Sequence, residues 1–108
     1  MVIELPDTLD AVRHRIKYRE DKKVYITVSL LEDCPVEVFA KFNEGETMEN
    51  FYKHAAWNAI TRLTSMLLRS GMELEDVITQ LDRSSIYEKD MPGLLAGVLK
   101  KYLKEDNK

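Results

Sequence analysis

Features that are scarce in this sequence exclude several classes of protein. The single cysteine, Cys34, cannot form an internal disulfide, so we expect a reducing, cytoplasmic setting. No apolar run approaches the roughly 20 residues that span a bilayer. The opening MVIELPDTLD is acidic and lacks the order of a secretion signal. We therefore expect one domain over residues 1–108, away from membranes, with a frayed tail at 104–108.

An excess of positive charge is also lacking. The chain has 16 lysines and arginines against 19 acidic residues, and its formal net charge is −3. The molecule as a whole therefore does not attract long nucleic acids or anionic lipids. Any contact with phosphate has to come from a local group of bases.

The patterns of familiar catalytic and metal sites are absent. No glycine-rich phosphate loop with a lysine is present, and no serine lies in a nucleophile-elbow pattern. His14 and His54 lack the spacing of a helical zinc pair, and Cys34 alone cannot build a structural zinc site. We therefore expect no catalytic residues, no metal, no cofactor and no enzyme activity.

Hydrophobic periodicity predicts strands first and helices second. Residues 12–19, 23–31 and 36–42 alternate apolar with polar side chains, which is typical of half-buried strands. Short polar links between them favour an antiparallel meander. This order predicts an α+β fold in which about three strands are followed by one long helix and two shorter helices packed on one face.

Helix signals place the boundaries of the three helices. The long helix runs from Thr47, a plausible cap, to Ser70, and Gly71 provides a C-terminal stop. A short helix follows at residues 74–81. The last helix covers residues 90–103 and opens with Asp90 as a possible cap.

The long helix has an apolar stripe and a polar stripe. Helical spacing predicts that one set of side chains faces the core: Tyr52, Ala55, Ala56, Ala59, Ile60, Leu63, Met66 and Leu67. A second set shares another side and is expected to face away: His54, Asn58, Arg62, Ser65 and Arg69. A surface helix usually mixes acidic with basic residues, but no acidic residue occurs from Phe51 to Gly71. The polar stripe therefore has two interpretations. It is plain exposed surface, or it is functional, as an anion site or a subunit interface.

Bases also follow the first predicted strand. One face carries Arg13, Arg15, Lys17 and Arg19, and Lys22 and Lys23 continue the run. Such charges protect a sheet edge from pairing, but guanidinium groups also bind phosphate in bidentate fashion. Two aromatics are candidates for stacking on a base: Trp57, which otherwise fills a core edge or an interface, and the strand residue Phe39.

Four segments resemble, in order, the TSCPD domain. They are KVYITVS, CPVEVFAKF, NAITRLTSMLLRSGMELEDVITQL and MPGLLAGVLKKYL. This domain is the C-terminal accessory domain of cobalamin-dependent ribonucleotide reductases and also occurs as small stand-alone proteins, often encoded by phages. The resemblance runs from about Lys23 to Leu103. It departs at the motif that names the family, where this chain has Lys89-Asp90-Met91-Pro92-Gly93 and keeps only the proline.

The resemblance implies a binding module detached from a nucleotide-handling enzyme. Stand-alone proteins of this kind in phages are associated with sequestering nucleotide-like immune signals, an anti-defence role. We therefore expect a homo-oligomer that binds a phosphorylated, nucleotide-type ligand, such as a cyclic nucleotide or an ADP-ribose derivative. The expected ligand-binding residues are Arg62, Arg69, Asn58, Ser65, Trp57, Arg13, Arg15 and Phe39.

Two alternatives remain open at this point. The chain could be a protein-interaction or regulatory subunit, for example a partner of a ribonucleotide reductase, with the arginines of the long helix as its interface. It could also be a purely structural oligomerisation domain that uses the small residues Gly93 and Gly97 for close contact.

Overall fold

The computed structural model describes residues 3–19, 22–42 and 48–104. Within these residues the elements are β1 (Asp10–Arg19), β2 (Lys22–Leu31), β3 (Cys34–Lys41), α1 (Met48–Arg69), α2 (Leu74–Ser84) and α3 (Met91–Lys100). The predicted α+β class is confirmed, and so is a first helix that is the longest. Thr47 and residues 105–108, where a cap and a frayed tail were predicted, lie outside the described residues.

The strands form one antiparallel sheet in the order β1-β2-β3. A two-residue turn joins β2 to β3, since Leu31 pairs with Cys34 and the residues between them are Glu32 and Asp33. Their φ angles are 52° and 67°. Two successive positive φ angles are typical of a type I′ turn, whose twist matches that of the flanking strands. The predicted meander is thus confirmed, with β2 and β3 joined by a tight turn.

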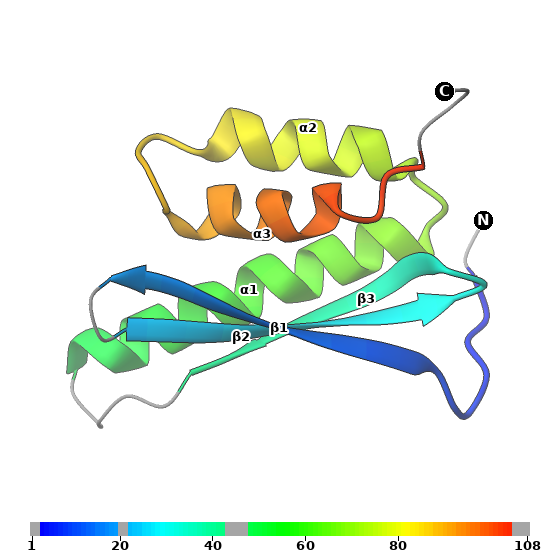
Figure 1. The fold of residues 1–108 in the computed structure, drawn as a ribbon, viewed down its shortest axis with the longest axis horizontal. Coiled ribbons are helices and arrows are strands. Elements are labelled where there is room, and N and C mark those ends of the chain that lie inside the picture. Colours follow the sequence, from blue (N-terminus) through cyan, green and yellow to red (C-terminus); the bar gives the residue numbers. More distant parts are fainter. Residues whose placement is uncertain (1–2, 20–21, 43–47, 105–108) are drawn as a thin grey trace.

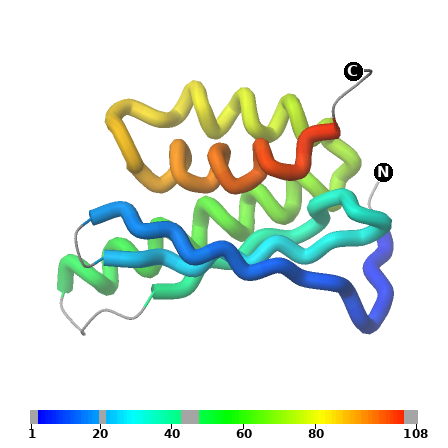
Figure 2. The backbone as a smooth tube through the Cα atoms, in the orientation of Figure 1, coloured from blue at the N-terminus to red at the C-terminus, as the bar shows by residue number. Residues whose placement is uncertain are grey.

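The three helices take two different positions relative to the sheet. Helices α2 and α3 lie together over one face, whereas α1 runs beside β3 (Figure 1). The backbone tube shows the same arrangement, with α1 next to the sheet and α3 above it (Figure 2). The rings of Phe42, just after β3, and His54 of α1 stack with centroids 3.9 Å apart. Helix α1 therefore covers one edge of the sheet, and β1 forms the other edge.

The core lies between the sheet and α3. Val24, Ile26 and Val28 of β2 are fully buried and share a cluster with Leu95 and Leu99 of α3. Each such side chain contributes about 1.5–3 kcal/mol relative to an exposed one. The alternation in residues 23–31 predicted this face correctly, because side chains in a strand point alternately to its two faces.

Helix α1 does not bury the side that the sequence predicted. Its buried side consists of Asn50, Trp57, Thr61, Thr64, Ser65 and Leu68. Tyr52, Leu63 and Met66, which were expected in the core, are 71%, 60% and 58% exposed. The widest apolar stripe was taken as the core side, but α1 packs against a strand edge. The backbone groups of an edge need polar partners, and the Ser65 hydroxyl supplies one for the N–H and the carbonyl oxygen of Val38.

Two predicted helix boundaries are confirmed. Helix α1 ends at Arg69, and Gly71 follows it with φ of 92°, a conformation that glycine adopts without a steric penalty. Asp90 caps α3 by accepting a hydrogen bond from the Gly93 N–H at 3.0 Å. No helix of the described residues is long and apolar enough to cross a membrane.

Candidate functional site

The face of the sheet turned away from α2 and α3 carries several of the predicted site residues. We call it the open face. Its strand side chains are Arg13, Arg15, Lys17, Lys23, Tyr25, Thr27, Ser29, Glu37, Phe39 and Lys41. Bases dominate this set, and Glu37 is its one acid. The open face is therefore positive, although the chain as a whole is not.

One row of the open face combines a base with an exposed aromatic ring. Strand register places Arg13 opposite Thr27, and Thr27 opposite Phe39. Phe39 is 52% exposed although it lies in the middle of β3. The guanidinium carbon of Arg13 lies 4.4 Å from the centre of the Tyr25 ring, which holds this arginine over the sheet. Tyr25 was not predicted as a site residue; its alternation with Val24 and Ile26 placed it on the other face of the strand and could have signalled it.

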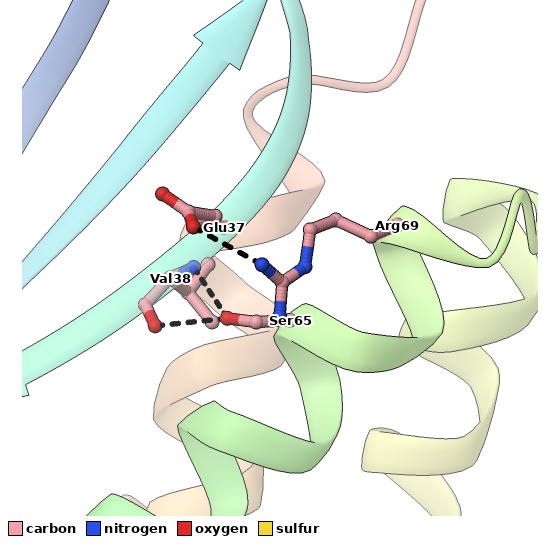
Figure 3. A network of polar contacts seen from close by, with 4 residues as sticks. All are labelled: Glu37, Val38, Ser65 and Arg69. Atoms are coloured by element: carbon pink, nitrogen blue, oxygen red, sulfur yellow. Dashed lines mark hydrogen bonds and ion pairs between the residues drawn. The ribbon is translucent and has the colours of Figure 1, made fainter. Parts of the chain in front are cut away.

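Helix α1 adds two more bases along the β3 side of the open face. Nη1 of Arg69 lies 3.5 Å from Oε2 of Glu37, as Figure 3 shows. Arg62 lies two turns earlier on the same side of the helix, and Asn58 one turn before that, and both are exposed. Among the described residues Arg62 forms no ion pair, whereas the charge of Arg69 is partly balanced by Glu37.

Ser65 is not available to a ligand on this surface, contrary to the prediction. Its hydroxyl accepts a hydrogen bond from the Val38 N–H at 2.9 Å and donates one to the Val38 carbonyl oxygen at 3.1 Å (Figure 3). The side chain is buried at 6% exposure. Ser65 thus fastens α1 to the edge of β3, and both capacities of its hydroxyl are used within the chain.

Trp57 is likewise interior and does not line the open face. It is 3% exposed and belongs to the core cluster. Its carbonyl oxygen accepts a hydrogen bond from the Thr61 hydroxyl at 2.8 Å. Of the two interpretations that its sequence context allowed, packing at the core edge is therefore the one that the structure supports.

One hollow of about 500 Å³ lies beside Arg69, at the β3 side of the open face, and is bordered by Ile3, Leu5, Met66 and Ser70. Two other hollows lie away from the open face. One of about 410 Å³ is bordered by Cys34, Met72, Leu74 and Tyr102. Another, of about 240 Å³, lies between the end of β1 and the starts of α1 and α3. Its wall mixes the bases Arg19, Lys22, Lys53 and Lys89 with the acids Glu49, Glu88 and Asp90. Near-balanced charge makes this second hollow a poorer anion site than the open face.

A polar pair on the opposite side of the sheet has a structural role. Nε2 of His14 lies 2.7 Å from the hydroxyl of Tyr102, which ties β1 to the end of α3. Burial lowers the pKa of His14, and the nearby charge of Lys101 lowers it further. Burial also raises the pKa of Tyr102. Both groups are therefore held in their neutral forms. No cluster of three or more potential metal ligands occurs among the described residues.

Comparison with known proteins gives one match. A family model described as the TSCPD domain matches residues 3–103. The chain belongs to the TSCPD domain family. No curated protein and no solved structure matches it.

The segment at the position of the family's TSCPD motif has a structural role in this chain. It leads into α3, where the carboxylate of Asp90 accepts hydrogen bonds from the N–H groups of Ile86, Tyr87 and Gly93 and from the Ser85 hydroxyl. Desolvation opposes the charged form, but these bonds outweigh it and lower the pKa of Asp90 to about 2. The carboxylate is thus fully used in holding the loop against α3.

Proposed function

We propose that this protein is a non-catalytic binding module for a phosphorylated, nucleotide-type ligand, and that the open face is its binding surface. The observation that carries the proposal is the row of Arg13, Thr27 and Phe39, in which a positively charged side chain lies on the same surface as an exposed aromatic ring. A mononucleotide presents the complementary pair of groups, a phosphate and a flat nucleobase.

The chemistry of the side chains supports this division of roles. Arg13 and Arg15 would bind phosphate, and guanidinium groups do so with two parallel hydrogen bonds. Phe39 would stack on the base, an interaction that contributes about 1–3 kcal/mol. Arg62 and Asn58, at the β3 side of the surface, would bind a second phosphate or the sugar. Ser65 and Trp57 are left out because they are interior.

Family membership and surface shape support a shared site. No strand side chain of the open face lines a described hollow, and only Arg69 at its border does, whereas ligand pockets usually enclose most of the ligand. A homo-oligomer, as the sequence suggested, would enclose the ligand between subunits. Sequestration of a cyclic nucleotide or ADP-ribose-type immune signal is the role that fits a module without catalytic groups.

A thermal-shift screen against cyclic di- and trinucleotides, ADP-ribose derivatives and dNTPs tests the proposal. Ligand at 100-fold excess over Kd stabilises the folded state by about 2.7 kcal/mol. In a domain of this size 1 kcal/mol shifts Tm by about 4–8 °C. We expect a shift for at least one ligand class, its loss in Arg13→Ala/Arg15→Ala and in Phe39→Ala, and its retention in Arg83→Ala on α2. An unchanged Tm with every ligand would exclude the proposal.

A second candidate is a protein-interaction or regulatory subunit, and the exposed apolar side chains of α1 favour it. It predicts that a specific protein is captured and that no small ligand binds. Arg62→Glu discriminates between the two functions. It should abolish protein capture if α1 is the interface, but only weaken ligand binding while Arg13 and Arg15 remain.

A further inference from the structure

One side of α1 is apolar along its length and largely exposed, and only near its C-terminal end do Ile3 and Leu5 border the same hollow as Met66. We call it the outer face of α1. It consists of Met48, Tyr52, Ala55, Ala59, Leu63 and Met66. Met48 is 67% exposed, and Tyr52, Leu63 and Met66 are more than half exposed. Exposed apolar surface of this extent usually marks a contact with another molecule.

We infer that a second copy of this chain packs on the outer face of α1, with the two helices antiparallel around a two-fold axis near Ala59. In such a pair a residue lies level with one equally far from Ala59 in the opposite direction. Leu63 therefore lies level with Ala55 of the other chain, and Met66 with Tyr52. Large side chains meet small ones, alanines let the backbones approach at the axis, and a thioether meets an aromatic ring.

Charge also favours a second copy here over the other unpaired border, β1. Pairing two β1 strands would bring Arg13, Arg15 and Lys17 of one chain against the same bases of the other. The outer face of α1 contains no charged residue. Like charges therefore oppose self-pairing through β1 but do not act within the contact through α1. This makes the outer face a self-complementary surface, as a two-fold interface requires.

The size of the surface sets the expected affinity. Helix α1 has 22 residues and is about 33 Å long, so a face about 10 Å wide projects roughly 330 Å². Stable interfaces bury about 800 Å² on each partner. The uneven surface of the side chains and the flanking residues Phe51 and Leu67 add buried area, but only part of this difference. We therefore expect a dimer with Kd in roughly the micromolar range. Arg62 flanks the contact on both chains, so screening by salt should tighten it.

Sedimentation velocity of the full chain without ligand tests this contact. From about 0.1 µM to about 1 mM protein we expect the mass to rise from near one chain of 12.6 kDa towards two. Ala59→Glu adds a charge at an exposed helix position and should weaken association at least tenfold. Gln80→Glu adds the same charge on the exposed side of α2 and should associate like the wild type. A wild-type monomer at every concentration would overturn the inference and leave α1 to a different partner.

Disulfide trapping tests the geometry independently of Ala59→Glu. In a Cys34→Ser background, Ala59→Cys should form a covalent dimer on mild oxidation, because the two thiols meet near the axis. Thr79→Cys, at an exposed position on α2, should not. Equal trapping of both variants would exclude the antiparallel α1 pair. Neither experiment contains ligand, so failure of the proposed binding function would leave these outcomes unchanged.

Discussion

Helices α1 and α3 use their apolar residues in opposite ways. Leu95 and Leu99 of α3 are fully buried against the sheet, and its outward position Gly97 has no side chain. Leu63 and Met66 of α1 are more than half exposed, while the Ser65 hydroxyl bonds to the strand edge. An apolar stripe therefore marks the core of the chain in α3. In α1 it marks an exposed surface, the one on which we infer that a second copy packs.

The largest test of this difference compares two leucine truncations. Leu99→Ala should destabilise the monomer by about 2–5 kcal/mol, because it opens a cavity in a fully buried site. Leu63→Ala should change it by no more than about 0.5 kcal/mol, since the side chain is exposed. Urea unfolding of dilute protein measures both. Similar losses would mean that α1 buries its apolar stripe after all.

The buried side of α1 should depend on hydrogen bonds where α3 depends on apolar contact. Ser65→Ala leaves the buried Val38 N–H without its partner and should cost about 1–3 kcal/mol. Ser84→Ala is the matched control, because that exposed hydroxyl bonds only to the Gln80 carbonyl oxygen of its own helix. It should cost no more than about 0.5 kcal/mol. Equal effects in denaturant unfolding would remove Ser65 as the fastening of α1 to β3.

The start of α3 should give the fold an acid-sensitive step. Because the folded-state pKa of Asp90 is lowered from 3.8 to about 2, its contribution is complete above the unfolded value. It is lost as pH falls through the folded value. Unfolding midpoints of the wild type should therefore drop between these two pKa values, and Asp90→Asn should flatten that part of the curve. Parallel curves for the two proteins would contradict this role.

The smallest expected effect concerns the two glycines of α3. Gly97 is exposed, and a Cβ there would meet nothing within 4 Å, so Gly97→Ala should stabilise the fold by about 0.5–1 kcal/mol. A Cβ at Gly93 would lie 2.9 Å from Oδ1 of Asp90, so Gly93→Ala should lower Tm instead. Differential scanning calorimetry separates the two. A loss of stability in Gly97→Ala would indicate that α3 has an outside contact too.

Local patterns predicted the fold because each of its elements obeys a local rule. Alternation identified β2 with its buried Ile26, Gly71 ended α1, and Asp90 capped α3. The family resemblance connected these local signals from about Lys23 to Leu103, and the family match over residues 3–103 confirmed the family.

The site was less predictable because it depends on where α1 lies. Periodicity correctly grouped Arg62, Ser65 and Arg69, but it could not tell that the helix would meet the edge of β3. That contact turned Ser65 inward and its apolar neighbours outward. Phe39 and Arg13 became neighbours across Thr27 only through strand register, which depends on pairing between distant segments.

Oxidation of Met66 measures most directly whether the outer face of α1 is exposed in the monomer and covered in a dimer. Trypsin places Met66 and Met72 in adjacent, separate peptides, Leu63–Arg69 and Ser70–Arg83, so mass spectrometry reads each alone. Well below the dimer Kd, Met66 should oxidise readily, and well above it Met66 should be protected. Met72, which is 38% exposed and lies outside the outer face, should react equally at both concentrations. Slow oxidation of Met66 at every concentration would mean that this face is buried within the chain, and equal fast oxidation would mean that no second copy covers it.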